Sequence, residues 1–130
     1  MKSIFISSLF MFSLFGFNKD NFNNSIWICR INATCVDTLK FEKDRHVSNY
    51  SCESDYTYKG TYVVTKNILT ITQKDDSHDE DGAKPEVYRL KFIIKNNKLY
   101  PQSNEKFENG KWIKAKEVIN KFYVFSKMKK

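Results

Sequence analysis

The amino-acid sequence predicts an all-β domain, an antiparallel up-and-down meander of about eight strands that closes fully or partly into a barrel. Segments in which apolar and polar residues alternate follow one another at short intervals, with tight polar turns between them and no long helical pattern. Seven tyrosines and eleven phenylalanines also suit strands. A chain of 130 residues is expected to form one domain. Closure into a barrel would remove exposed sheet edges.

The first residues have the pattern of a signal peptide. Met1–Lys2 is short and basic, and Ile4–Phe17 is an uncharged run rich in Phe, Leu and Ile. This run is shorter than the roughly 20 residues that a membrane-spanning helix needs, although an uncleaved anchor is the alternative. We therefore expect a signal peptide over residues 1–18, a flexible mature N-terminus over 19–24 and a β-barrel domain over 25–130. The mature protein would be secreted or periplasmic, with no membrane span after signal cleavage.

Alternation places the strands along the domain. Residues 103–110 are polar and loop-like, and residues 112–118 fit either a strand or one or two turns of helix. Gly60 lies within an expected strand and therefore indicates a bend, a bulge or a close backbone approach. The expected strands are Ser25–Ile31, Asp37–Glu42, Arg45–Cys52, Tyr56–Thr65, Ile68–Gln73, Glu86–Lys95, Lys98–Gln102 and Phe122–Lys127.

Three cysteines in an exported chain suggest one disulfide and one leftover thiol. If Lys43–Asp44 is a two-residue hairpin turn, Cys35 lies directly opposite Cys52. Directly opposed residues of an antiparallel pair have Cα atoms about 4.5 to 5.5 Å apart, which a disulfide can bridge. We prefer this pairing to the two others and to three free buried thiols. Cys29 would then be unpaired, and its place beside Trp27 favours packing over reactivity.

With the strands in place, the chain resembles the small lipocalin-like domains of exported Bacteroidetes-type proteins over residues 25–127. The resemblance implies a lipocalin-like barrel and a small apolar ligand, and it brings no catalytic motif. Arg45 stands where the family usually has Gly after the turn Asp, which leaves the turn type open. The residues that carry the resemblance are Trp27, Cys35–Phe41, Lys43–Asp44, Cys52–Glu53, Gly60–Tyr62 and Asn67–Ile71.

Two functions follow from a barrel of this size. The first is an exported lipocalin-like binding module, without catalysis, whose interior holds a small apolar or amphipathic ligand. The alternative is an extracytoplasmic protein-interaction or inhibitor domain, because an eight-stranded barrel can also be filled by its own side chains. The candidates to line a ligand site share one face of two expected strands: Tyr56, Tyr58, Tyr62, Tyr88, Leu90 and Phe92.

The charged segments favour neither a metal site nor a nucleic-acid site. The loop that follows Lys74 is acidic, and its weak metal candidates are Asp76, His78, Asp79 and Asp81. If this loop were a calcium-binding loop, Tyr88 would occupy the position of the bidentate Glu, so that motif fails. We expect no metal and no cofactor, and no catalytic motif suggests an enzyme. Residues 102–130 hold eight lysines against three glutamates, which we interpret as a solubilising surface rather than a nucleic-acid site.

Overall fold

The computed structural model describes residues 22–77, 82, 84–116 and 119–129. The expected signal peptide over 1–18 therefore lies outside the described residues. The described elements are β1 (Ile26–Asn32), β2 (Cys35–Phe41), the 3-10 turn η1 (Lys43–Arg45), β3 (His46–Ser51), β4 (Tyr56–Thr65), β5 (Ile68–Asp75), β6 (Glu86–Lys95), β7 (Lys98–Glu108), β8 (Lys111–Lys114) and β9 (Phe125–Lys127).

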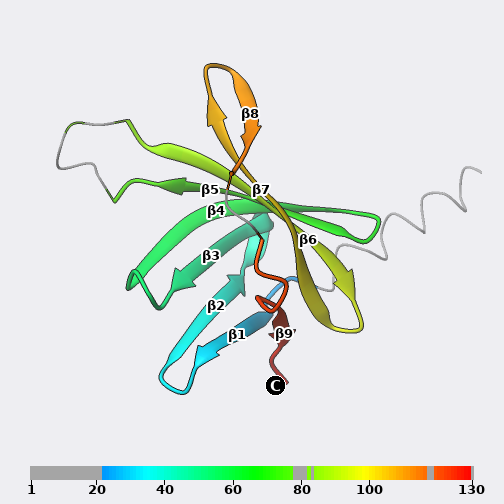
Figure 1. Cartoon of the computed structure of the whole chain (residues 1–130). Coiled ribbons are helices and arrows are strands. Elements are labelled where there is room, and N and C mark those ends of the chain that lie inside the picture. Colours follow the sequence, from blue (N-terminus) through cyan, green and yellow to red (C-terminus); the bar gives the residue numbers. More distant parts are fainter. Residues whose placement is uncertain (1–21, 78–81, 83, 117–118, 130) are drawn as a thin grey trace, which may run out of the picture.

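The strands form a closed antiparallel barrel of eight strands with one strand outside it. Strands β1 to β7 each pair with the next one along the chain, and β9 pairs with both β1 and β7. Strand β8 pairs with the C-terminal part of β7, and the β7–β8 hairpin projects away from the barrel (Figure 1). The predicted all-β up-and-down meander, closed into a barrel, is confirmed.

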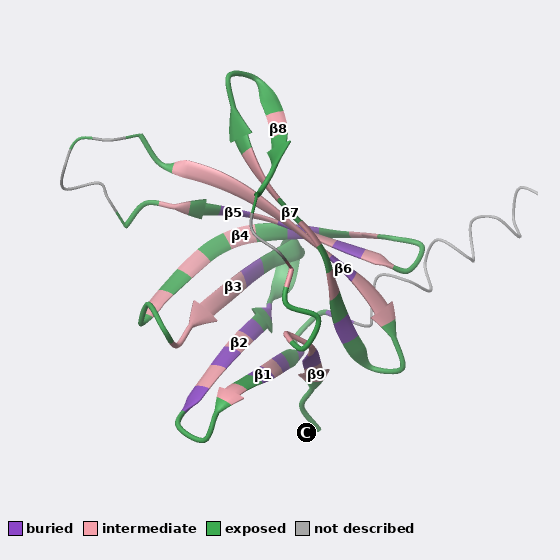
Figure 2. Ribbon diagram, in the orientation of Figure 1, coloured by how far each residue is buried: buried purple, intermediate pink, exposed green. Residues whose placement is uncertain are grey.

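The barrel interior holds the apolar core. Buried residues alternate with intermediate or exposed ones along β1 and β2, as Figure 2 shows, and Trp27, Cys29, Leu39 and Phe41 are among the buried ones. Burial of these side chains is the main stabilising contribution, since burying one large apolar side chain is worth about 1.5–3 kcal/mol. The largest fully buried side chains are Trp27, Phe41, Phe125, Leu39, Leu69, Ile71, Leu99 and Val47.

Phe22 lies within the segment 19–24 that the sequence predicts to be flexible, yet its side chain is packed into the core. Only 3% of Phe22 is exposed, and its ring stacks on Trp27 with a centroid distance of 5.3 Å. It also lies 4.9 Å from the ring of Phe41. The Asn-rich sequence around this residue hid its role, because one aromatic side chain is enough to attach a short polar segment to the core.

The disulfide between Cys35 and Cys52 is confirmed, with a Cα–Cα distance of 5.5 Å. The prediction of a two-residue turn at Lys43–Asp44, from which this pairing was derived, is wrong. Phe41 pairs with Val47, so the connection is one residue longer and Cys35 is not directly opposite Cys52. The added residue is accommodated because Arg45 adopts a left-handed backbone conformation, with φ of 62°, at the position where the resembling family has Gly.

The C-terminal third also differs from the prediction. Strand β7 continues to Glu108 instead of ending at residue 102, and the segment expected to be a loop belongs to a hairpin. Asn109 and Gly110 form its turn with positive φ values of 50° and 77°. Residues 111–114 form a strand, which settles the choice between strand and helix for the start of that segment. The last strand begins at Phe125 and not at Phe122, whose side chain is 91% exposed.

Gly60 allows β4 and β5 to approach closely. It pairs with Val47 on one side and with Gln73 on the other. A Cβ atom at this position would collide with the carbonyl oxygen of Thr72 and would lie 2.9 Å from the Cα atom of Gln73. The sequence-based expectation of a close backbone approach is therefore confirmed.

Replacing Gly60 by Ala should lower the free energy of unfolding by about 2 kcal/mol or more, because two backbones must separate to admit the methyl group. The matched control is Gly110→Ala, where an added Cβ meets nothing within 4 Å and only the positive φ is unfavourable. That control should cost about 1 kcal/mol. Urea unfolding of both variants measures the two costs, and equal costs would contradict the close approach.

Candidate functional site

One end of the barrel, which carries the β4–β5 and β6–β7 turns, is packed with aromatic rings. We call it the β4–β5 end. Phe22 lies against Trp27, Phe41 and Tyr62, and the rings of Phe41 and Tyr62 meet edge to face with centroids 4.9 Å apart. These contacts fill the interior at this end with side chains of the chain itself.

Three of the six predicted ligand-lining residues lie in this core. Tyr62 and Phe92 are 7% and 4% exposed, and Leu90 is partly buried against the same cluster. The ring of Phe92 packs edge to face on Phe125 at 5.8 Å. Their contacts are with other side chains of the core, so these residues fill the barrel in this structure.

The other three, Tyr56, Tyr58 and Tyr88, lie toward the opposite end of the barrel, which we call the β5–β6 end. Tyr56 packs on Tyr58 with a centroid distance of 4.8 Å. The hydroxyl of Tyr56 donates a hydrogen bond to Asp76, and this bond raises the pKa of Tyr56 to about 12. Asp76, one of the weak metal candidates, therefore accepts a hydrogen bond from a tyrosine.

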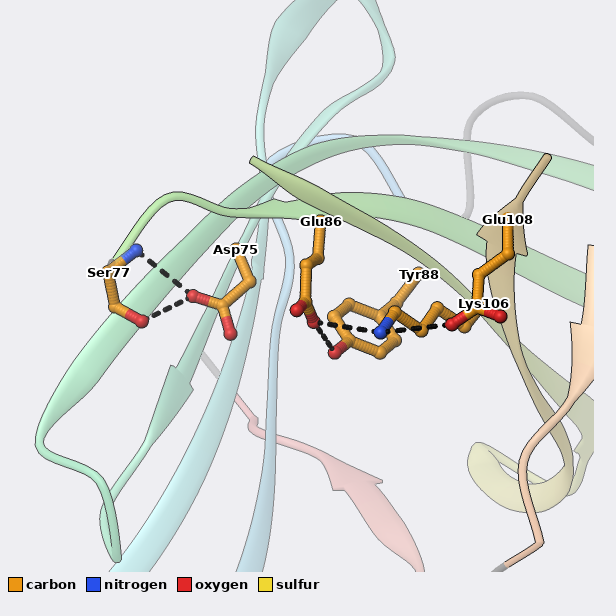
Figure 3. A network of polar contacts seen from close by, with 6 residues as sticks. All are labelled: Asp75, Ser77, Glu86, Tyr88, Lys106 and Glu108. Carbon is orange, nitrogen blue, oxygen red and sulfur yellow. Dashed lines mark hydrogen bonds and ion pairs between the residues drawn. The ribbon is translucent and has the colours of Figure 1, made fainter. Parts of the chain in front are cut away.

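A polar network surrounds Tyr88 (Figure 3). Its hydroxyl donates a hydrogen bond to Glu86, and the Nζ atom of Lys106 lies 3.4 Å from Glu86 and 3.2 Å from Glu108. The hydrogen bond from Tyr88 lowers the pKa of Glu86, and Lys106 lowers it further. Ion pairs at this exposure contribute little stability, so the network mainly fixes the orientation of Tyr88.

The remaining metal candidates, His78, Asp79 and Asp81, lie outside the described residues. Within residues 22–77, 82, 84–116 and 119–129, no group of three or more His, Cys, Asp or Glu side chains is placed to hold a metal ion. The same part of the chain contains no helix that is long and apolar enough to cross a membrane.

Asp37 and Tyr123 form a buried polar contact that sequence reasoning missed. Asp37 is 5% exposed and accepts hydrogen bonds from the backbone N–H of Cys52, at 2.8 Å, and from the hydroxyl of Tyr123. It thus joins the disulfide loop to the segment before β9. An acidic residue at an inward position of an alternating strand, between Cys35 and Leu39, was the signal that could have revealed it.

Cys29 on β1 pairs with Asp37 on β2, and it is the free cysteine. Burial raises the pKa of its thiol, and the negative charge of Asp37 raises it further. The thiol therefore stays protonated at neutral pH, which makes it a poor nucleophile. His46 lines a groove on the outer face of the barrel, whereas Cys29 belongs to the core, so the two do not form a catalytic pair.

An aromatic and charged cluster on the outside of the β7–β8 hairpin was also missed. The guanidinium of Arg89 binds Glu105 through two hydrogen bonds of 2.9 and 3.0 Å and lies 4.2 Å from the ring centroid of Trp112. Phe107 packs on Trp112 at 5.1 Å. Asn109-Gly110 is the sequence signal for this hairpin, although the polar composition of residues 103–110 predicts a loop.

Among the described residues, an outer groove and a smaller hollow are open to solvent. A groove of about 450 Å³ crosses the outer face of β3, β4 and β5, where polar side chains such as His46, Lys59, Thr61 and Lys74 line it. A smaller hollow of about 260 Å³ lies at the β4–β5 end, and its lining includes Trp27. Both hollows have linings that differ from the six predicted ligand-lining residues.

No protein-family model, no curated protein sequence and no solved structure matches this chain. The resemblance to lipocalin-like domains therefore stays a prediction.

Stability should fall at alkaline pH because of Tyr123. Burial raises the pKa of this tyrosine above its ordinary value of 10, and the hydrogen bond to Asp37 raises it further. The folded state thus holds the phenol proton more tightly than the unfolded state, so this contribution is complete below about pH 10 and is lost as the pH rises above it.

Replacing Tyr123 by Phe should lower stability at neutral pH by about 1–3 kcal/mol, since Asp37 loses a buried hydrogen bond. The same variant should lose less stability than the wild type between about pH 8 and about pH 11. Urea unfolding at both pH values tests this, with Tyr100→Phe as the control because Tyr100 is exposed. An unchanged alkaline loss in Tyr123→Phe would contradict the assignment.

Proposed function

We propose that this protein is an extracytoplasmic binding module that acts without catalysis and contacts another protein with the outside of a filled barrel. The observation that carries the proposal is the packing of the interior. Residues from the N-terminal segment and from most barrel strands meet in one buried cluster, which extends from Phe22 to Phe125. A ligand of drug size needs a pocket of about 300–1,000 Å³, and entry into this core would require displacing fully buried rings.

The disulfide supports a place outside the cytoplasm. Disulfides persist in oxidising compartments and are rare where thiols are kept reduced. Cys35–Cys52 closes a loop between residues 17 positions apart, which contributes about 3 kcal/mol through the unfolded chain. Secretion or periplasmic export is part of this proposal.

The outer surface supports recognition of a protein. Phe107 and Ile113 are 45% and 47% exposed on a hairpin that projects from the barrel (Figures 1 and 2). Tryptophan and arginine are enriched among the residues that dominate protein interfaces. Trp112 of the hairpin and Arg89 of β6 contact each other at this place. Phe107 lies opposite Trp112 in the register, so these two aromatic side chains share one face of the hairpin, and apolar side chains gathered in one place mark interaction sites more often than scattered ones do.

Native mass spectrometry separates this function from ligand storage. The protein purified under native conditions should have the mass of the chain alone, and extraction with organic solvent should not change its urea unfolding midpoint, because no cargo supports the core. A stoichiometric small molecule that is lost on extraction would contradict the proposal.

A second arm tests the protein partner directly. A photo-crosslinking residue is placed at Phe107 on the hairpin, at Thr61 in the outer groove or at Ile26 on β1 as a comparison site. Crosslinking to one protein of discrete mass is expected from the hairpin or groove position, and excess unlabelled protein should suppress it. Equal crosslinking from all three positions would indicate non-specific contact and would contradict the proposal.

A second candidate function, binding of a small anionic amphiphile, is favoured by the hollow at the β4–β5 end. Its apolar walls include Val64 and Ile94, and Lys66 also lines it. An apolar surface beside an ammonium group suits a short acyl chain with a carboxylate. The volume of about 260 Å³ limits the occupant to a small molecule.

Decanoate titration tests this second candidate. Val64→Trp should abolish binding because the larger side chain fills the hollow, whereas Val63→Trp is the matched control on the exposed face of the same strand. Lys66→Gln should weaken binding about threefold through the loss of one exposed charge contact. Calorimetry measures these affinities, and equal binding by the wild type and Val64→Trp would exclude the hollow as the site.

A further inference from the structure

Strand β8 has one edge that no other strand of the described chain covers. It is the last strand in the sheet order, and it pairs with β7 alone. Figure 1 shows the hairpin standing apart from β1 and β9. A free strand edge presents unpaired N–H and C=O groups, which can pair with an added strand.

The register tells which backbone groups face outward. The backbone N–H of Ala115 donates to the carbonyl of Asn104 at 2.9 Å, and Ile113 pairs with Lys106. In an antiparallel pair, alternate residues direct both backbone groups toward the partner strand. Trp112 and Lys114 therefore direct their N–H and C=O groups away from β7, toward the free edge.

The edge is held in a fixed conformation before any partner arrives. Trp112 contacts both the guanidinium of Arg89 and the ring of Phe107, and Glu105 fixes that guanidinium with two hydrogen bonds. A preorganised strand loses less conformational entropy on binding. The hairpin turn at Asn109 and Gly110 further fixes the register of β8.

The charges at this edge select the partner. Lys111, Lys114 and Lys116 are exposed, and none of them forms an ion pair within the described part of the chain. A second copy of residues 111–116 paired at this edge would bring three more lysines beside these, and like charges on neighbouring strands are destabilising. The same lysines attract carboxylates, so an acidic strand fits this edge and a second copy does not.

We infer that the free edge of β8 binds an extended acidic segment of a partner protein by strand addition. This inference rests on the proposed function and assigns it a surface and a partner chemistry. Backbone hydrogen bonds to Trp112 and Lys114 provide the pairing. Glutamate or aspartate side chains beside Lys114 on one face of the sheet provide the charge match, and apolar side chains pack beside Ile113 on the other face.

The probe is a synthetic peptide of about ten residues in which Glu and Val alternate, since such a peptide favours an extended conformation and carries the required charge. Amide chemical shifts in the NMR spectrum of the mature protein locate its binding. We expect the largest shifts over residues 111–114, and we expect affinity to decrease as salt is added. A peptide of alternating Lys and Val is the charge control and should not bind.

Two variants at one position separate charge from strand pairing. Lys114→Gln removes the charge and keeps the outward N–H, and it should weaken binding about threefold. Lys114→Pro also removes that N–H, which an edge strand tolerates, and it should weaken binding by about a further fivefold. Circular dichroism and the unfolding midpoint establish that both variants are folded.

The outcomes distinguish this inference from the proposed function. Equal affinities of Lys114→Gln and Lys114→Pro, or equal binding of the acidic and basic peptides, would overturn strand addition at β8. Peptide shifts confined to the outer groove around Lys59 and Lys74 would also overturn it while leaving a protein-binding surface. Absence of peptide binding together with specific crosslinking at Thr61 would refute the β8 site alone, whereas loss of both signals would refute the proposed function as well.

Discussion

The barrel depends on one buried side chain in a very short strand. Strand β9 contains three residues, and it joins β1 to β7 through two residue pairs on each side. A ladder of this length cannot hold two strands together by its hydrogen bonds alone, since each contributes only about 0.5–1.5 kcal/mol net. Phe125 supplies the missing stability because it is 1% exposed and packs against Phe92 and Tyr123.

The contact between Tyr123 and Asp37 extends this closure to the disulfide loop. Tyr123 belongs to the segment that leads from the projecting hairpin back to β9, and Asp37 also accepts the N–H of Cys52. A single carboxylate therefore joins the closing segment, β2 and the disulfide-bonded turn. Because a buried carboxylate is unfavourable without partners, these three parts of the chain stabilise one another.

The part of the fold that alternation encodes was predictable from the sequence. Strands from Ile26 to Lys95 follow period-two patterns, and a cysteine pair near a polar turn located the disulfide. The register of that turn was not predictable, because nothing in the sequence shows that Asp44 and Arg45 both adopt left-handed conformations and that Phe41 pairs with Val47. Likewise, nothing in the sequence near Phe22 distinguishes an anchored aromatic residue from one in a flexible segment.

The predicted ligand-lining residues show the limit of face patterns. Tyr56 and Tyr62 share a face of β4, as alternation requires, but Tyr62 lies in the core and Tyr56 contacts Asp76. Their surroundings depend on how far along the barrel each residue lies and on which aromatic rings arrive from distant segments. Phe22 and Phe125 come from the two ends of the described chain, so their filling of the interior cannot be read from one strand.

Strand β8 lies outside the barrel, and the lysines of β8 therefore have two effects. If β8 were part of the barrel, its edge would be paired and its composition would be free to vary. Outside the barrel, the edge would promote association between copies unless charges opposed it. Lys111 and Lys114 provide that opposition, and the same charges leave an acidic strand as the favoured partner. Protection against self-association and selection of a partner are therefore the same physical property of this edge.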